Sequence, residues 1–308
     1  MSVYTTVGRD DLAPWLAPLG VGVLEDLAGI AAGIQNSNYF VSAGGCRWVL
    51  TVFEHLDPRQ IDFYLALQEH LAARGIPCPR PQPDAQGRLW RPLAGKPAAL
   101  FTCLAGACVD TPTPAHCQAL GGMLARLHRA GADFPSPLPN SCGATWRETT
   151  GRGLAPLLAD DERGRLLAEL DFQAACDHAS LPRGIVHADL FRDNVLWLPD
   201  GTLSGVLDFY FAGEDCLLFD LAVAANDWCA DDDHLRVLLA GYEALRPLTA
   251  AEAAAWPVLR RAAALRFWLS RLEAKHSPRA GAVVTIKEPD HFASLLQRLR
   301  LAPPGLPR

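Results

Sequence analysis

The first hundred residues alternate apolar and polar positions in short runs, a pattern typical of strands joined by tight turns. Two runs rich in aromatic and β-branched residues, 38–42 (NYFVS) and 47–54 (RWVLTVFE), flank the pair Gly44-Gly45. A Gly-Gly turn between such runs predicts a β-hairpin. By the same criteria, the other elements expected in this region are a helix over 58–75 and strands over 88–92 and 98–104.

Beyond this region the apolar residues follow the helical period. Thr113-Pro114 is a typical N-cap and first-turn pair, and the ends of 249–252 (TAAE) fit a capping box. One predicted hairpin, 195–209, interrupts the helices, and the Pro-, Ser- and Gly-rich segment from about 132 to 153 is expected to be irregular. Helices are expected after Thr113 and over 161–178, 219–228, 232–245 and 249–276.

This order of elements predicts an α+β, bilobal fold, with a small β-rich N-terminal lobe and a larger, mainly helical C-terminal lobe. The 308 residues are enough for two such lobes. The expected boundaries are 1–101 for the N-terminal lobe, 102–106 for a hinge and 107–308 for the C-terminal lobe.

Composition and charge exclude several classes of function. The net charge of −6 and the lack of a basic run argue against nucleic-acid binding, because phosphate contacts need clustered Lys and Arg. No apolar run approaches the roughly 20 residues that span a bilayer, and the N-terminal stretch lacks a signal-peptide pattern. The nine cysteines are scattered, without C-x-x-C spacing. A zinc site or a disulfide framework is therefore not expected, and we predict a cytoplasmic protein.

One polar stretch, 187–196 (HADLFRDNVL), leads directly into the apolar strand of the predicted hairpin. His187, Asp189 and Asn194 have the H-x-D-x4-N spacing of a kinase catalytic loop. In phosphoryl transfer, a carboxylate orients the accepting hydroxyl and oxygen ligands hold a divalent cation. The stretch therefore predicts a phosphoryl-transfer site with Asp189 as the catalytic base, although Asp and Asn are also common in turns without chemistry.

Asp208 supplies a second carboxylate to this candidate site. It lies on the far strand of the predicted hairpin, which folds it back beside Asn194. Amide and carboxylate oxygens are hard ligands that suit Mg²⁺, so Asn194 and Asp208 are the expected metal ligands. His187 is expected to brace the loop. Ala188 stands where protein kinases carry an arginine, which favours a small-molecule kinase.

Several segments together resemble the aminoglycoside phosphotransferase and choline kinase family, which has a protein-kinase-like fold. They are the H-x-D-x4-N loop, the strand that ends in Asp208-Phe209, the run 220–222 (DLA), the hinge 98–106 (AALFTCLAG) and 124–128 (LARLH). Within this family the chain is similar to the bacterial homoserine kinases of the phosphotransferase-like type. The segments that carry this narrower resemblance are IAAGIQNSNYFV, WVLTVFE, HADLFRDNVL, LDFY, FDLA with NDWC, and RFWLSRL.

The resemblance implies a reaction and a set of roles. ATP would phosphorylate L-homoserine to O-phospho-L-homoserine, for threonine biosynthesis, with Mg²⁺ as the cofactor. Asp189 would be the base or hydroxyl-orienting group, Asn194 and Asp208 the metal ligands, and Asp220 a structural brace for the catalytic loop.

The resemblance also implies an ATP site in the N-terminal lobe, with a turn over the phosphates and a hinge that holds adenine. Small polar side chains and backbone N–H groups suit phosphate, although the spacing of Gly29 and Gly33 by itself equally fits an ordinary hairpin turn. The residues expected at ATP are Gly33, Asn36, Ser37, Asn38, Thr51, Thr102, Cys103 and Leu104.

Thr51 departs from the general kinase pattern, which places a phosphate-binding lysine at this position of the strand. The homoserine kinases of this type share the threonine, so the departure does not contradict the resemblance. It leaves the phosphate clamp unassigned. Lys96 lies near the hinge in the sequence, and Glu69 is a candidate helix glutamate without a strand lysine to pair with.

A zwitterionic acceptor such as homoserine needs a guanidinium for its carboxylate and a carboxylate or carbonyl for its ammonium. The candidates are Asp227, Trp228, Arg266 and Arg271. On a helix, Arg271 falls near Phe267 and Trp268. The alternative is that the aromatic residues pack the core and the arginines are ion-paired or at the surface.

Two other functions stay open at this point. A kinase of the same family could act on an amino alcohol, a sugar or an aminoglycoside. The run 231–233 (DDD) would suit a polycationic aminoglycoside, although such runs are usually solvated helix starts. A catalytically silent nucleotide-binding protein is supported only by the absent strand lysine. The sequence does not predict the oligomeric state.

Overall fold

The computed structural model describes residues 4–31, 36–135, 137–176, 178, 180–276, 288–303 and 305–306. The chain divides into two compact units between Ala105 and Gly106. We call them the N-terminal unit and the C-terminal unit. The division falls within the segment that the sequence assigns to a hinge, and the lobe boundaries themselves stay predictions.

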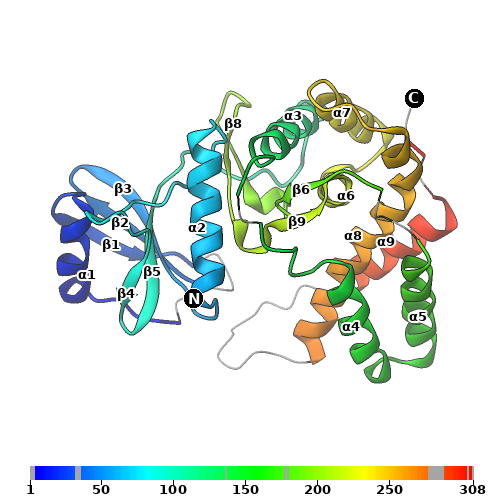
Figure 1. Cartoon of the computed structure of the whole chain (residues 1–308), viewed down its shortest axis with the longest axis horizontal. Coiled ribbons are helices and arrows are strands. Elements are labelled where there is room, and N and C mark those ends of the chain that lie inside the picture. Colours follow the sequence, from blue (N-terminus) through cyan, green and yellow to red (C-terminus); the bar gives the residue numbers. More distant parts are fainter. Residues whose placement is uncertain are drawn as a thin grey trace. The chain divides into compact units, whose positions relative to one another are not determined.

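A five-stranded antiparallel sheet forms the N-terminal unit, in the order β1-β2-β3-β5-β4 (Figure 1). Its strands are β1 (Leu24–Gly29), β2 (Ser37–Ala43), β3 (Cys46–Val52), β4 (Arg91–Leu93) and β5 (Lys96–Thr102). The predicted β2–β3 hairpin is confirmed. Gly44 and Gly45 have φ values of 58° and 74°, which residues with a Cβ rarely adopt. The sequence did not predict β1, whose strand residues are only half-buried or exposed.

The two faces of this sheet have different surroundings. One face forms a buried cluster with the apolar side of α1 (Arg9–Leu16), and Val52 and Ala98 belong to it. Side chains alternate along a strand, so Thr51 and Ala99, which pair with each other across β3 and β5, point to the opposite face. This alternation decides below which polar residues share a face.

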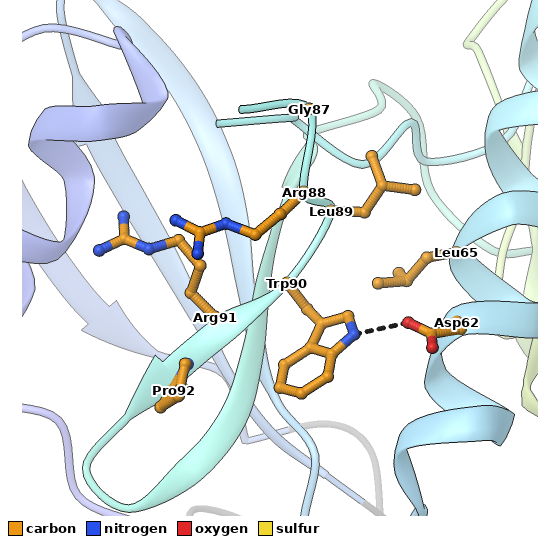
Figure 2. A pocket seen from close by; sticks show the side chains of 8 residues that line it. All are labelled: Asp62, Leu65, Gly87, Arg88, Leu89, Trp90, Arg91 and Pro92. Atoms are coloured by element: carbon orange, nitrogen blue, oxygen red, sulfur yellow. Dashed lines mark hydrogen bonds between the residues drawn. The ribbon is translucent and has the colours of Figure 1, made fainter. Parts of the chain in front are cut away.

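The helix predicted from Pro58 is confirmed as α2 (Pro58–Ala73). Asp57 and Gln60 form the reciprocal hydrogen bonds of a capping box at its start. Asp62 on this helix accepts a 2.7 Å hydrogen bond from the indole N–H of Trp90, which ties the helix to the segment before β4 (Figure 2).

The C-terminal unit is mainly helical, and it also contains two two-stranded sheets, β6–β9 and β7–β8. Its helices are α3 (Pro114–Ala130), α4 (Ala144–Leu154), α5 (Asp160–Ala174), α6 (Leu217–Trp228), α7 (Asp232–Glu243), α8 (Ala250–His276) and α9 (Asp290–Leu301). Its strands are β6 (Arg183–Val186), β7 (Val195–Trp197), β8 (Leu203–Val206) and β9 (Gly213–Cys216). The predicted α+β class and the β7–β8 hairpin are therefore confirmed.

Some local predictions are wrong. Asp208 was expected on the far strand of the β7–β8 hairpin, but β8 ends at Val206. The segment 132–153 was expected to be irregular, but its last part belongs to helix α4, which begins at Ala144. The helix has no side-chain cap, and it buries Arg147, Gly151 and Leu154. It packs against α5 and α8. Tertiary packing rather than local propensity thus stabilises α4.

Helices α3 and α7 pack against each other unusually closely (Figure 1). A Cβ at Gly121 would lie 2.0 Å from the carbonyl oxygen of Leu238, and one at Gly241 would lie 2.1 Å from that of Gln118. Both distances are far below van der Waals contact, so the backbones can approach only because these positions are glycine.

Among the described residues, no helix combines the length and the apolar character that a membrane crossing requires.

Candidate active site

A buried carboxylate holds the backbone of the predicted catalytic loop. Asp220, on α6, accepts hydrogen bonds from the backbone N–H groups of His187 at 2.7 Å and Ala188 at 2.8 Å. Ala188 has a φ of 62°, a left-handed conformation that costs free energy for a residue with a side chain. The two hydrogen bonds stabilise this conformation and so fix the direction in which the chain enters Asp189. This is the geometry expected of a brace.

His187 supports the same loop as a neutral imidazole. Its Nε2 lies 2.7 Å from the carbonyl oxygen of Leu207, which can only accept, so Nε2 carries the hydrogen. Burial lowers the pKa of His187 and outweighs the neighbouring Asp220 charge. The unprotonated Nδ1 then accepts from the backbone N–H of Asp189 at 3.3 Å. His187 thus links the loop to the end of β8 and has no vacant nitrogen for proton transfer.

Two further buried side chains, His128 and Tyr242, extend this network, and neither was predicted from the sequence. Nε2 of His128, on α3, donates to Asp220 at 3.1 Å, and its Nδ1 lies 2.7 Å from the hydroxyl of Tyr242 on α7. Burial alone would raise the pKa of Asp220, but the hydrogen bonds from His128 and the loop outweigh burial. The net pKa is lowered, so the carboxylate stays ionised. The only available signal was the LARLH segment, whose histidine had no assigned partner.

The candidate base, Asp189, is contacted at both of its carboxylate oxygens. The side-chain amide of Asn194 donates to the Asp189 backbone carbonyl at 2.8 Å and to Oδ2 at 3.3 Å. Arg266, from α8, donates through Nη1 to Oδ1 at 3.3 Å. The Asp189 side chain is 16% exposed, so it remains reachable from solvent while its orientation is fixed. An ionised carboxylate has about four lone-pair positions, so these contacts are compatible with a further hydrogen bond from an acceptor hydroxyl.

Asn194 and Asp208 present the oxygens expected of a metal site. The amide nitrogen of Asn194 faces the Asp189 carbonyl, so its Oδ1 points away and is available as a ligand. The backbone N–H of Leu207 donates to the Asn194 carbonyl at 2.9 Å, which fastens the residue before Asp208 to Asn194. The Asp208 carboxylate is exposed, in a left-handed conformation with φ of 59°. These hard oxygen donors fit Mg²⁺.

The surroundings of Asp208 favour a bound cation. Although its carboxylate reaches solvent, desolvation by the surrounding protein raises its pKa, and the negative charge of Asp193 adds to this effect. The described part of the chain holds no cluster of three or more His, Cys, Asp or Glu residues that could bind a metal by itself. Further ligands, such as phosphate oxygens and water, would have to complete a site built on Asn194 and Asp208.

The predicted phosphate-site side chains that the structure describes are hydrogen-bonded within the N-terminal unit. The Thr51 hydroxyl donates to Asn38 Oδ1 at 2.8 Å. Ser37 is fully buried, and its hydroxyl donates to Glu54 at 2.6 Å. Asn36 accepts from the backbone N–H of Glu54 at 3.3 Å. These contacts shape the start of β2. Gly33 lies outside the described residues.

Lys96 does not take the place of the missing strand lysine. It forms an ion pair with Glu54, directly after β3. Lys96 shares a sheet face with Ala98, whereas Thr51 points to the other face. Glu54 also accepts from Ser37 and from the Thr5 hydroxyl, so this cluster holds the N-terminal segment against the sheet.

The remaining predicted residues of the N-terminal unit lie at the end of β5 or on α2. Thr102 ends β5, and its hydroxyl accepts from the Arg80 backbone N–H at 2.9 Å. Cys103 and Leu104 follow it and are half-buried. The adenine contact of these three residues stays a prediction. Glu69, which had no assigned partner, forms an exposed ion pair with Arg80.

Two of the four predicted acceptor residues contact the catalytic loop, and their role at the acceptor stays a prediction. Trp228 is 1% exposed, and its indole N–H donates to the Leu190 carbonyl at 3.0 Å. Asp227 accepts from the backbone N–H of Arg192 at 2.8 Å and from its guanidinium at 3.1 Å. This double contact joins the loop to the end of α6.

A hollow of about 430 Å³ adjoins this loop in the C-terminal unit. Its lining residues are Cys108, Val109, Asp110, Phe191, Arg192, Asp193, Asp227, Arg271, His291 and Phe292. Arg271 donates to the backbone carbonyl of Glu288 at 2.9 Å and has no ion pair within the described ranges. A second pocket, of about 440 Å³, lies in the N-terminal unit between α2 and 87–92 (Figure 2). None of the predicted ATP residues lines it.

This site combines a supported aspartate, an adjacent amide and a second carboxylate on a two-unit α+β chain, which defines a phosphotransferase of the kinase type. A model of the phosphotransferase enzyme family matches residues 26–265, so the chain belongs to that family. The homoserine kinase of Methylobacillus flagellatus is 47% identical over 303 residues, covering 96% of this chain and 95% of that protein. The homoserine kinase of Polaromonas naphthalenivorans is 45% identical over 317 residues, covering 99% and 100%.

The fold itself is shared with solved structures. Spectinomycin phosphotransferase, in a complex with ADP and spectinomycin, matches with a TM-score of 0.72 at 12% identity, covering 95% of this chain and 97% of that one. An identity this low shows the fold alone. The structural match confirms the predicted protein-kinase-like architecture.

Proposed function

We propose that this protein catalyses the ATP-dependent phosphorylation of L-homoserine to O-phospho-L-homoserine, a step of threonine biosynthesis. The observation that carries the proposal is the Asp189 carboxylate, oriented by Asn194 and Arg266. Membership of the phosphotransferase family and the names of relatives at 45% and 47% identity support it. The cytoplasmic location stays a prediction from the cysteine pattern.

In this proposal Asp189 orients the acceptor hydroxyl towards the γ-phosphorus of ATP. The hydroxyl oxygen forms a bond to that phosphorus while the bond to the bridging oxygen of ADP breaks, and the hydroxyl proton passes to Asp189. The contacts from Asn194 and Arg266 fix the direction of the carboxylate. Such positioning supplies much of the rate enhancement of phosphoryl transfer.

Asn194 and Asp208 would hold Mg²⁺ through Asn194 Oδ1 and the Asp208 carboxylate. When bound, the ion neutralises charge on the phosphates of ATP. Replacing Asp208 with Asn removes one negative ligand. We expect that variant to need a much higher Mg²⁺ concentration for half-maximal turnover. An unchanged Mg²⁺ requirement would remove Asp208 from the metal site.

ATP is the proposed phosphoryl donor. Backbone groups near Thr102, Cys103 and Leu104 would hold adenine. The side chains of Ser37 and Thr51 are already hydrogen-bonded within the N-terminal unit. Backbone N–H groups of the segment predicted to turn over the phosphates are therefore the better phosphate donors in this proposal.

The test is the release of ADP from Mg-ATP with different acceptors. L-homoserine, choline, 3-aminopropan-1-ol and an aminoglycoside are compared with a reaction without acceptor. We expect homoserine to give by far the highest kcat/KM. Preference for another acceptor would support kinase activity but contradict homoserine as the substrate. Nucleotide binding without turnover for any acceptor would favour the silent nucleotide-binding alternative.

A further inference from the structure

Arg266 is a buried cation with only part of its hydrogen-bonding capacity used. It is 2% exposed. Nη1 donates to Asp189, but Nε and Nη2 are shielded from solvent and have no hydrogen-bond partner in the part of the chain that the structure describes. The rings of Phe211 and Phe267 lie 4.6 and 3.9 Å from its guanidinium carbon. These ring contacts offset only part of the cost of burying a charge, so the two vacant donors point to a missing ligand.

The vacant donors define the chemistry of that ligand. Nε and Nη2 share one edge of the planar guanidinium, and their N–H bonds run parallel. This edge matches the two oxygens of a carboxylate in a bidentate pair. Nη1, which holds Asp189, belongs to a different edge. One arginine can therefore contact the candidate base and a second anionic group at the same time.

We propose that the Nε–Nη2 edge of Arg266 binds the α-carboxylate of the amino-acid acceptor and so selects it over alcohols that lack a carboxylate. The proposal rests on the function proposed above and deepens it. Three carbons separate the hydroxyl of homoserine from its carboxylate, a span of about 5 Å. That length lets the hydroxyl reach Asp189 while the carboxylate lies on the neighbouring edge of the guanidinium. Arg266 thereby fixes the position of the acceptor relative to Asp189.

Entry of the carboxylate requires a side chain to move, because the Arg266 edge is shielded in this structure. Phe211 is the side chain suited to this movement. It is half-buried and ends the short 3₁₀ turn Phe209–Phe211, which directly follows Asp208. We expect this ring, which lies against the guanidinium, to move when the acceptor binds.

Arg271, on the same helix, is the alternative candidate for binding the acceptor carboxylate. It lines the hollow beside the catalytic loop and has no ion pair within the described ranges, so it could also attract a carboxylate. In contrast to Arg266, it donates to a backbone carbonyl, that of Glu288. Substitution of Arg271 with Met therefore serves as the matched control for the same substitution at Arg266.

The experiment compares kcat/KM for L-homoserine and for 3-aminopropan-1-ol, which is homoserine with hydrogen in place of its carboxylate. Both acceptors use Asp189, so any loss of its orientation affects them equally. Only homoserine loses the carboxylate contact. We define the ratio as kcat/KM for L-homoserine divided by kcat/KM for 3-aminopropan-1-ol. In Arg266→Met we expect this ratio to fall by about 100-fold. In Arg271→Met we expect the ratio to stay as in the wild type. Calorimetric binding of the two acceptors gives the same comparison where turnover is too slow.

Arg266→Lys covers the case in which the Met variant does not fold. Lysine keeps the charge but has no bidentate edge, so the ratio should still fall, by about tenfold. An equal loss for both acceptors, or a changed ratio in Arg271→Met instead, overturns the inference. The proposed function fails independently, if the wild type accepts 3-aminopropan-1-ol but not homoserine.

Discussion

The carboxylate of Asp220 accepts a 2.7 Å hydrogen bond from the backbone N–H of His187, 33 residues earlier in the chain. Both residues are fully buried. The same carboxylate holds the strained Ala188 and pairs with His128. A single buried charge thus links the catalytic loop, α6 and α3. The loop conformation depends on this network rather than on the loop sequence alone.

Replacing Asp220 with Asn tests this dependence. The amide retains the volume, but its NH₂ group would face a backbone N–H that needs an acceptor. We expect a loss of about 2–4 kcal/mol in the free energy of unfolding, measured by urea denaturation. Asp26→Asn, at an exposed strand position, is the control and should leave the midpoint unchanged. A wild-type midpoint for Asp220→Asn would contradict the bracing role.

Replacing Asp189 with Asn tests the proposed base. The amide cannot accept the hydroxyl proton, so kcat should fall by about two to four orders of magnitude. The ATP affinity should change little, because the proposed adenine and phosphate contacts lie in the N-terminal unit. Steady-state kinetics and calorimetric nucleotide binding measure the two effects. Turnover near that of the wild type would exclude Asp189 as the base.

The crossing of α3 and α7 predicts opposite effects at two adjacent glycines. A Cβ at Gly121 would collide with the Leu238 carbonyl, whereas one at Gly122 would lie 3.6 Å from its nearest neighbour, the Gly241 carbonyl. We expect Gly121→Ala to destabilise the protein by more than about 2 kcal/mol. Gly122→Ala should stabilise it by up to about 1 kcal/mol through helix propensity. Thermal and urea unfolding compare the pair, and equal effects would refute the close packing.

The buried neutral state of His187 predicts a pH dependence of stability. Burial lowers its pKa in the folded protein below the ordinary value of 6.5. Below pH 6.5 the unfolded chain therefore binds a proton that the folded chain does not bind. The free energy of unfolding then falls as the pH falls, by at most about 1.4 kcal/mol per pH unit from this residue.

Replacing His187 with Gln isolates this contribution. Gln can still donate to the Leu207 carbonyl but cannot take up a proton. Unfolding of both proteins is measured from pH 7.5 down to pH 5. The variant should lose less stability over this range than the wild type. An equally steep loss in both proteins would assign the acid sensitivity to other groups, such as His291, whose pKa is also lowered by burial.

Features set by neighbouring residues could be predicted from the sequence alone. Gly44-Gly45 specifies the β2–β3 turn because only glycine readily adopts the positive φ values found there. Asp57 and Gln60 specify the start of α2 because their capping bonds span three positions. The H-x-D-x4-N spacing brings Asn194 to Asp189 within a single loop. In each case the interacting groups are at most a few residues apart, so local chain geometry brings them together.

Only the tertiary structure decided the contacts that support the candidate site. Asp220 meets His187 across 33 positions, and Arg266 meets Asp189 across 77. The same holds for the approach of α3 and α7 at Gly121 and for the uncapped helix α4. No local pattern encodes these contacts, because each depends on how separate elements pack. The sequence by itself therefore predicted which residues are candidates for the chemistry, and packing decided which side chains hold those candidates in place.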